Sequence, residues 1–302
     1  MSTPRMPPAG PAWPPPGTPV LTRVRIAAGR VRHNLAGRRF DREQLNTLVL
    51  FVGNARSGTT LFKSLLDAHP QVLIANELNL LHCLVRGERW HTVLGRIAAS
   101  SRRFARNPLW TGYDYRVPAA GTAEAPVGAR QDITVVGDKA AAVTAKRLAR
   151  DAGLLRAVAR WCPLSLRLIH CTRHPLDVVA SLAKRGLPDR EQAAEEYIRL
   201  ENVAAMTCTE HGPEGCHRVY HERLVANPRA ELIRAATFLD VEADEGWLDA
   251  CCSVVNSSPH HSRLEVSWTG TVTDDLERRA ALLPHLREYF ANGRLQGVPG
   301  TG

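Results

Sequence analysis

The chain has 302 residues, 44% of them hydrophobic, and a formal net charge of +9. That length suffices for one large hydrophobic core or two smaller ones, and the sequence has no run of about 18 apolar residues that would predict a membrane-spanning helix. Residues 1–40 contain no acidic residue and seven arginines: Arg5, Arg23, Arg25, Arg30, Arg32, Arg38 and Arg39. The rest of the chain is therefore nearly neutral, and bulk charge does not predict a nucleic-acid partner.

The proline-rich start of the chain predicts a flexible segment. Residues 1–20 contain eight prolines, a density that blocks helix and strand alike. Residues 21–40 differ, because apolar residues recur there at helical spacing with arginines on the other faces: Val24, Ala28, Val31 and Leu35. This basic amphipathic helix either makes a peripheral contact with an anionic membrane or packs beside the domain as an ordinary solvated helix. Its small apolar side chains favour the second interpretation.

From Asp41 onward, short apolar runs alternate with helical patterns. Strand-like runs lie at 47–53, 72–75, 133–137, 166–171 and 217–221, a helical pattern covers 59–69, and residues 189–302 are mainly helical. Apolar strands without polar interruptions suit a parallel sheet covered on both faces. We predict an α/β three-layer domain over residues 41–302, with a central parallel sheet and a helical C-terminal half, preceded by a flexible head over residues 1–40.

A long insert separates the second and third predicted strands. Residues 105–131 hold Trp110, Tyr113 and Tyr115 among glycines and prolines. Long irregular inserts in compact domains are often functional, and aromatic side chains offer rigid contact area for a ligand. Two interpretations stay open: a ligand-binding loop, or a loop whose aromatic residues cover the core.

The seven cysteines form no CxxC pair and no zinc-binding pattern: Cys83, Cys162, Cys171, Cys208, Cys216, Cys251 and Cys252. This spacing predicts buried, reduced thiols of a cytoplasmic protein rather than a disulfide framework. The N-terminus also lacks the apolar segment of a signal peptide. No cluster of His, Cys and Asp has metal-ligand spacing, so we expect no metal.

The sequence GNARSGTT, residues 53–60, lies between a predicted strand and a predicted helix. In this context a glycine-containing loop directs consecutive backbone N–H groups and a helix N-terminus at one anion. Gly53 and Gly58 permit the tight turn, while the hydroxyls of Thr59 and Thr60 are further donors. Arg56 supplies positive charge that can contact two oxygens of a phosphate or sulfate.

This loop lacks the lysine of an ATP-binding loop. The motif GxxxxGK[ST] has lysine where this chain has Thr59, and that lysine normally reaches the β- and γ-phosphates. Its absence argues against transfer of a γ-phosphoryl group. An ATP-dependent kinase of the same fold is therefore a less favoured alternative.

A second motif, LIHCTRHPLDVVASLAKRG, covers residues 168–186. Arg173 ends a predicted strand, and Pro175 suits the first turn of the helix that follows. Ser181 lies about two turns along that helix. Arg173 and Ser181 can thus converge on one phosphate.

Together the two motifs resemble those of the sulfotransferases that use 3′-phosphoadenosine 5′-phosphosulfate (PAPS). The stretch RSGTTLFKSLLDAHP, from Arg56 to Pro70, is similar to the family's phosphosulfate loop, [KR]SGTT followed by LxxLLxxHP. The resemblance implies a P-loop fold in which residues 56–60, Ser57 included, hold the 5′-phosphosulfate. It also implies that Arg173 and Ser181 hold the 3′-phosphate. PAPS is then the co-substrate, and cationic side chains rather than a metal neutralise its charge.

Residues 219–241 resemble a further family segment, YExLxxxP followed by FL, with His221 and Glu222 in place of Tyr-Glu. The C-terminal RKGxxG element, which binds the 3′-phosphate in cytosolic members, is absent. We expect its replacement within residues 257–263, notably Arg263, or near Trp268.

Sulfuryl transfer to an alcohol needs a base and a group that neutralises the charge on the leaving oxygen. Glu77 follows the second predicted strand, at the edge where α/β proteins bind ligands, and tyrosyl-protein sulfotransferases carry a glutamate base at a similar place. Alternatively, Glu77 only caps the helix expected at 78–86. His82 is the second candidate base. Lys139, after the third strand, is expected to stabilise the leaving group, the alternative being a surface lysine paired with Asp138.

The sequence therefore predicts a sulfotransferase that moves a sulfuryl group from PAPS to a hydroxyl or amine acceptor. Arg56, Glu77 and Lys139 are the expected catalytic residues. The motifs do not specify the acceptor, because acceptor loops carry no transferable code. A module that binds membrane or nucleic acid through the basic head is the alternative from another class.

Overall fold

The computed structural model describes residues 19–41, 43–106, 116–117, 132–185, 187, 189–256 and 260–297. The proline-rich residues 1–18 lie outside this part of the chain. So do the three aromatic residues of the long insert, Trp110, Tyr113 and Tyr115, and the beginning of the 257–263 segment.

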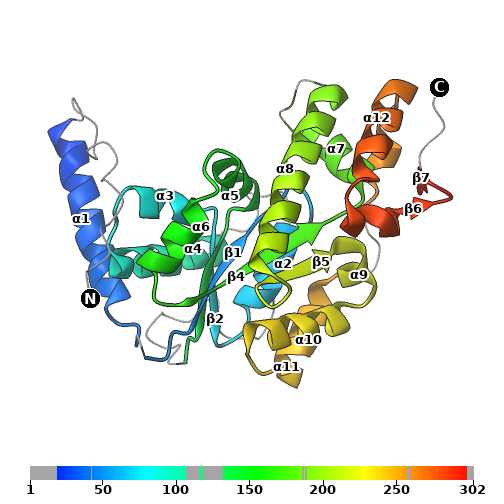
Figure 1. Ribbon diagram of the computed structural model, residues 1–302. Helices are drawn as coiled ribbons and strands as arrows, with labels where there is room; N and C mark the ends of the chain where they lie inside the picture. Colours follow the sequence, from blue (N-terminus) through cyan, green and yellow to red (C-terminus); the bar gives the residue numbers. More distant parts are fainter. Residues whose placement is uncertain are drawn as a thin grey trace.

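Within the described residues, five parallel strands form a central sheet in the order β2-β3-β1-β4-β5 (Figure 1). The strands are β1 (Thr47–Phe51), β2 (Val72–Asn76), β3 (Val135–Lys139), β4 (Ser165–Thr172) and β5 (Cys216–Tyr220). All five predicted strand runs are thus confirmed. Strand β3 ends two residues later than expected, so Lys139 is its last residue rather than the residue after it.

Side chains of β1 alternate between two apolar layers. Leu48 and Leu50 join a core with helices α4 and α8, whereas Val49 and Phe51 join a core with α2, α10 and α11. All four side chains are buried. A run of apolar residues without polar interruptions is what a strand needs when both faces of its sheet are covered, so the predicted three-layer α/β architecture is confirmed.

The helices surround this sheet, and α12, near the C-terminal end of the chain, lies beyond it at the right of Figure 1. Their bounds are α1 (Val20–Gly37), α2 (Thr59–Asp67), α3 (Leu80–Val85), α4 (Trp90–Arg106), α5 (Ala141–Leu148), α6 (Leu154–Trp161), α7 (Pro175–Ala183), α8 (Arg190–His211), α9 (His221–Ala226), α10 (Pro228–Leu239), α11 (Glu245–Val254) and α12 (Gly270–Ala280). Two 3₁₀ segments, η3 (Ser262–Glu265) and η4 (Pro284–Tyr289), and the short strands β6 (Phe290–Ala291) and β7 (Arg294–Leu295) complete the described chain. None of the described helices has the length and apolarity needed to cross a membrane.

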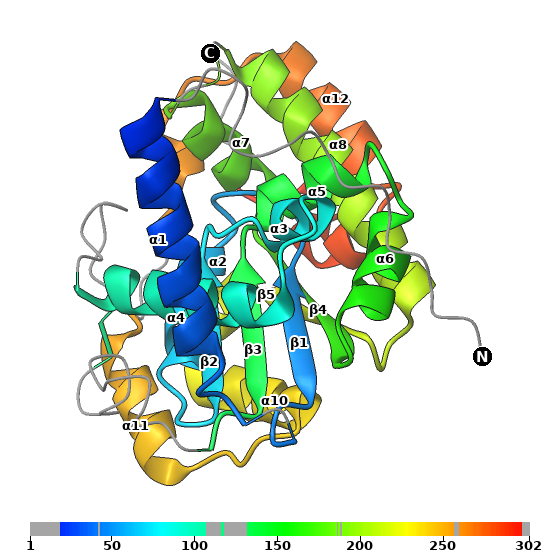
Figure 2. The same ribbon diagram turned by 90° about the vertical axis from the view of Figure 1, so that its left-hand side faces the viewer.

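Helix α1 packs against α4 at the outer edge of the molecule (Figure 2). The two helices approach closely at glycines: a Cβ on Gly37 would lie 1.8 Å from the carbonyl oxygen of His91, and one on Gly95 would lie 1.9 Å from that of His33. Residues 20–37 are therefore a helix packed beside the domain, as one of the two sequence interpretations held. Its opposite face is exposed.

The expectation that all cysteines are reduced thiols is wrong for one pair. Cys208, near the C-terminal end of α8, forms a disulfide with Cys216, the first residue of β5. The chain reverses between them at Gly212, which has a φ of 79°, and the two Cα atoms lie 5.3 Å apart. The pairing depends on this turn, so the spacing of cysteines along the sequence did not reveal it. The other cysteines, all within the described residues, are free thiols.

The close approach of α1 and α4 leads to a test of stability. Gly37→Ala is expected to lower the free energy of unfolding by about 1–3 kcal/mol, because the added methyl group has no space against the α4 backbone. Urea unfolding followed by circular dichroism measures the change. Gly29→Ala on the same helix is the control: no atom lies within 4 Å of the new Cβ, so stability should rise by up to about 1 kcal/mol. Equal effects of the two variants would contradict the packing argument.

Candidate active site

The loop between β1 and α2 needs glycine at both ends. Gly53 has a φ of 128° and Gly58 a φ of 82°, values that side chains other than glycine disfavour. Gly58 is the N-cap of α2, and a Cβ there would lie 2.4 Å from Nδ1 of His221. The predicted strand–loop–helix context is thus present, with Thr59 and Thr60 in the first turn of α2.

Arg56 joins the two sequence motifs. Its backbone has a left-handed φ of 69°, and its Nε donates a hydrogen bond of 2.9 Å to the hydroxyl of Ser181. Arg173 lies against the same residue, since its Nη1 is 3.4 Å from the Arg56 carbonyl oxygen. Residues that are more than a hundred positions apart in the sequence therefore meet at one place beside the α2 N-terminus.

Helix α7 is held at its start by Glu222. Pro175 is the first residue of this helix, as predicted. One carboxylate oxygen of Glu222 accepts the backbone N–H of His174 at 2.9 Å, and the other accepts the Tyr289 hydroxyl at 2.8 Å. The segment that resembled the family's YExL element thus orients the helix that carries Ser181.

Arg263 reaches the second motif through Asp177. Its backbone N–H and its Nη1 donate to the two oxygens of the Asp177 carboxylate at 2.8 and 2.6 Å. Arg173 also approaches this carboxylate, at 3.9 Å, and donates to the carbonyl of His260. The structure therefore brings Arg263 and Arg173 to one carboxylate on α7, although these two arginines are ninety positions apart in the sequence.

Several buried polar atoms around this loop have no hydrogen-bond partner among the described residues. They include Ser57 Oγ, Arg173 Nε and His221 Nδ1. Buried polar groups are nearly always hydrogen-bonded in folded proteins. Donors gathered at a helix N-terminus next to Arg56 fit a phosphate- or sulfate-bearing ligand.

His221 contacts the loop between β1 and α2, and the sequence analysis did not predict this contact. Its ring faces Gly58, and burial together with the charge of Arg173 lowers its pKa to about 4. The imidazole is therefore neutral at pH 7. The departure from Tyr-Glu at this position was the one signal in the sequence, but only the fold places the ring against the loop.

Glu77 and Lys139 form an ion pair on the other side of β1. Lys139 Nζ lies 2.6 Å from Glu77 Oε1, and the side chains are 4% and 45% exposed. Lys139 is thus not a surface lysine, and it pairs with Glu77 rather than with Asp138. The helix-cap alternative for Glu77 is also wrong, since α3 begins at Leu80 and Asp138 accepts the Leu80 N–H.

Asp138 holds the backbone that presents Glu77. Its two carboxylate oxygens accept the N–H groups of Leu78 and Leu80 at 3.0 and 2.8 Å. Glu77 and Asn79 both have a left-handed φ, 56° and 61°, and such strained residues persist where the surroundings over-determine them. Burial raises the pKa of the Asp138 carboxyl to about 6, although the two hydrogen bonds oppose the shift.

His82, the second candidate base, is engaged by two arginines. Its Nδ1 lies 3.1 Å from Arg147 Nη2, and its Nε2 lies 3.2 Å from Arg86 Nη1. Burial and these two positive charges lower its pKa. Both ring nitrogens thus contact structural partners, which disfavours His82 as a base.

Comparison with known proteins identifies the family. The model of the sulfotransferase family matches residues 49–245, which is more than half of the chain and contains both motifs. The chain belongs to the sulfotransferase family.

Two curated relatives are from nematodes. Protein-tyrosine sulfotransferase A of Caenorhabditis elegans is 25% identical over 75% of this chain and 62% of its own length. A putative protein-tyrosine sulfotransferase of Caenorhabditis briggsae is 25% identical over 66% of this chain and 68% of its own length. The chain thus spans less than two thirds of the first of these relatives. Among solved structures, the sulfotransferase domain of the Synechococcus PCC 7002 olefin synthase aligns with a TM-score of 0.48 and 20% identity, over 83% of this chain and 91% of that domain.

The raised pKa of Asp138 leads to a pH-dependent prediction. A carboxyl group whose pKa rises on folding contributes stability that is lost as the pH rises through the folded-state value. The stability of the wild type relative to Asp138→Asn should therefore fall between pH 3.8 and about 6. Thermal unfolding of both proteins across this range measures the difference. A difference that stays constant or grows with pH would contradict the assignment.

Proposed function

We propose that this chain is a PAPS-dependent sulfotransferase. The observation that carries the proposal is the convergence of Arg56, Ser181 and Arg173 beside the α2 N-terminus. One site then offers donors for a phosphosulfate from the loop and donors for a separate phosphate from the β4–α7 turn. Family membership supports the same reaction.

In this proposal, two groups of residues bind PAPS. Residues 56–60 would hold the 5′-phosphosulfate through backbone N–H groups, hydroxyls and the Arg56 guanidinium. Arg173 and Ser181 would hold the 3′-phosphate. Arg263 would contribute to this second group, because it shares the Asp177 carboxylate with Arg173.

Sulfuryl transfer then needs the proton chemistry of Glu77 and the charge of Lys139. The acceptor hydroxyl forms a bond to sulfur while the bond between sulfur and the phosphate oxygen breaks, and adenosine 3′,5′-bisphosphate leaves. Glu77 takes the hydroxyl proton, and its 45% exposed side chain is open to an acceptor. Lys139 and Arg56 neutralise the charge that grows on the leaving oxygen.

An ATP-dependent kinase is not favoured. The loop has Thr59 where an ATP-binding loop has lysine, and the chain belongs to the sulfotransferase family. For the acceptor we propose a hydroxyl group. The curated relatives named protein-tyrosine sulfotransferases make a tyrosine side chain one candidate. A nucleic-acid partner and a metal are not part of the proposal.

The compartment is a separate question. The sequence predicted a cytoplasmic protein, and that location stays a prediction. The Cys208–Cys216 disulfide counts against it, because reducing compartments keep most thiols unpaired.

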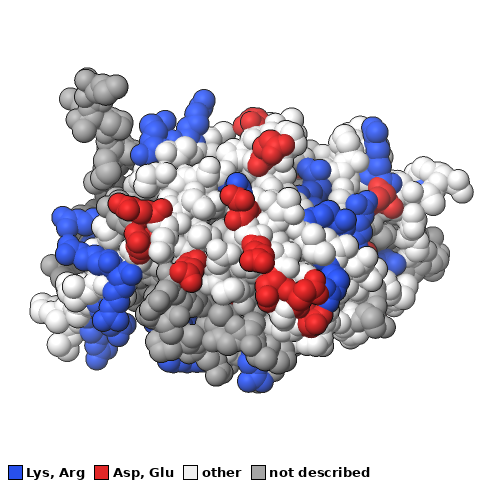
Figure 3. Space-filling model, turned by 90° about the horizontal axis from the view of Figure 1, so that it is seen from below, with Lys and Arg blue, Asp and Glu red and all other residues white. Residues whose placement is uncertain are grey.

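The proposal includes contact between α1 and an anionic membrane surface. Its exposed face carries a stripe of apolar side chains that are 59–75% exposed: Val20, Leu21, Val24, Val31 and Leu35. Exposed arginines lie beside this stripe. Figure 3 shows basic side chains gathered at the left of the view, the side of the molecule on which α1 lies in Figure 1. A helix with these two features binds the interface of anionic bilayers through apolar burial and charge attraction.

Removal of the 3′-phosphate contact tests the binding groups. Arg173→Met should weaken adenosine 3′,5′-bisphosphate by about 10- to 100-fold, because a hydrogen bond to a charged group contributes about 1.5–3 kcal/mol. ADP, which has no 3′-phosphate, should bind the variant and the wild type alike in calorimetry. Arg185→Met, an exposed arginine just beyond α7, is the control and should leave both ligands unaffected. Wild-type binding of ADP that equals or exceeds that of the bisphosphate would exclude the sulfotransferase assignment.

A glutamine at position 77 tests the base. Glu77→Gln should lower kcat by about 10²- to 10⁴-fold, the usual contribution of a general base, measured with labelled PAPS and an acceptor found by screening. Affinity for adenosine 3′,5′-bisphosphate should stay unchanged. His82→Gln is the matched control and should retain turnover. Undiminished turnover of the Glu77 variant would remove Glu77 as base.

Vesicle sedimentation tests the membrane contact. The protein should bind vesicles of phosphatidylcholine with phosphatidylserine, but not phosphatidylcholine alone. Val31→Asp combined with Leu35→Asp should abolish this binding. Leu282→Asp, which replaces a leucine that is 78% exposed outside α1, should not. Equal binding by both variants, or self-association through α1 in sedimentation velocity, would contradict the proposal.

A further inference from the structure

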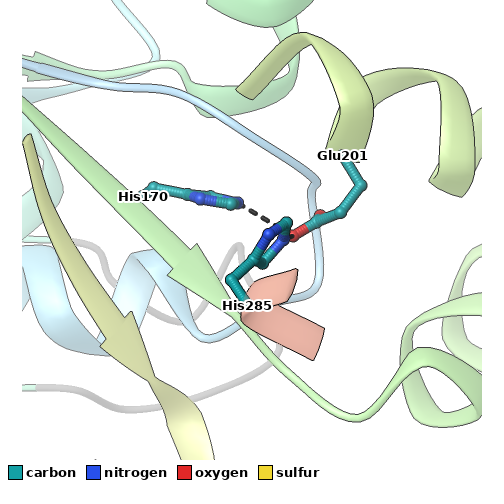
Figure 4. A group of neighbouring side chains, drawn as sticks. All are labelled: His170, Glu201 and His285. Carbon is teal, nitrogen blue, oxygen red and sulfur yellow. Dashed lines mark hydrogen bonds and ion pairs between the residues drawn. The ribbon is translucent and has the colours of Figure 1, made fainter. Parts of the chain in front are cut away.

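A buried polar cluster lies next to the start of the phosphate loop, which is the turn of residues 53–58 between β1 and α2. His170 on β4, Glu201 on α8 and His285 on η4 point toward one another (Figure 4). Nε2 of each histidine is 2.9 Å from Glu201 Oε1. The histidines are 0% and 7% exposed and Glu201 is 0% exposed. Three such groups within 4.8 Å of one another are of the kind that can hold a metal ion.

The contacts around the cluster argue against metal ligation. Arg218 Nε lies 3.3 Å from Nδ1 of His170. A guanidinium only donates hydrogen bonds, so Nδ1 accepts and the ring proton is on Nε2, which faces Glu201. A nitrogen that carries a proton cannot bind a metal, and metal-bound histidines normally donate their other N–H to an acceptor.

The second oxygen of Glu201 connects this cluster to the loop. Asn54 Nδ2 donates to Glu201 Oε2 at 2.7 Å and to the carbonyl of Tyr197, one helical turn earlier, at 3.0 Å. His170 also packs against Gly53, where a Cβ would lie 2.9 Å from the ring. Gly53 and Asn54, two consecutive residues of the loop, are therefore held in place by β4 and α8.

Glu201 is suited to this position because its carboxylate oxygens lie within 2.9 Å of both histidine rings and of Asn54 Nδ2. Burial alone would raise the pKa of its carboxyl, but the two imidazoles beside it hold that pKa below its usual range. A buried carboxylate with several N–H donors is costly to disturb, since loss of one partner leaves a buried group unsatisfied.

We propose that Glu201 is a positioning residue of the nucleotide site, which fixes the first turn of the phosphate loop through Asn54. It touches no substrate atom. Its effect is to keep the loop N–H groups aimed at the anion before the ligand arrives, so that binding does not have to order them. The proposal rests on the proposed function only in the choice of ligand.

Two measurements test it. In calorimetry, Glu201→Gln and Asn54→Ala should each weaken adenosine 3′,5′-bisphosphate by about tenfold, and the double variant should be no weaker than the worse single variant. The KM for PAPS should rise while kcat changes little. Glu277→Gln is the matched control, because this buried carboxylate accepts the Leu295 N–H instead and should leave ligand affinity unchanged.

Hydrogen exchange supplies a readout that needs no ligand. Amides of residues 54–58 should exchange faster in Glu201→Gln and Asn54→Ala, but not in Glu277→Gln. If the wild type does not bind the bisphosphate, the proposed function fails while this readout still decides on Glu201. Wild-type loop exchange in Asn54→Ala, effects that multiply in the double variant, or one equivalent of metal that is lost in Glu201→Gln would overturn the proposal.

Discussion

The turn between β1 and α2 is the constraint on which the site depends. The chain leaves the centre of a parallel sheet, reverses through two glycines with positive φ, and begins a helix whose first N–H groups lack intrahelical partners. That geometry leaves no room for a side chain at Gly58, because the His221 ring fills the space. The candidate residues Glu77, Lys139 and Arg173 then come from the ends of other strands of the sheet, β2, β3 and β4.

The order of the strands places the candidate side chains around the loop. Strand β3 is one neighbour of β1 and ends at Lys139, while β4 is the other neighbour and leads to Arg173. Because parallel strands end at the same edge of a sheet, their carboxyl ends place these cations on opposite sides of the loop. Arg173 and Ser181, the proposed donors to the nucleotide, thus lie toward β4 and α7. The Glu77–Lys139 pair, which is proposed to meet the acceptor, lies toward β2 and β3.

Three carboxylates do much of the positioning around this edge. Asp138 holds the strained backbone of Glu77, Glu222 caps α7, and Glu201 holds Asn54. Each accepts N–H or O–H donors, so each couples a distant element to a residue of the site. Functional sites commonly store strain that the surrounding structure must support, and Asp138 supplies such support at Glu77 and Asn79.

The sequence by itself determined the strands, the loop and the two phosphate motifs. Apolar periodicity and the residue types that anion binding requires are local properties, readable within a window of fifteen residues. The sequence analysis also named Glu77 and Lys139, but each on its own, and did not predict that they pair. It misjudged the Cys208–Cys216 pair, missed the contacts of His221 and Asp138, and missed the Glu201 cluster. Those contacts link residues from different elements, and only the tertiary structure decided them, because the order of strands and the crossing of helices set which distant side chains meet.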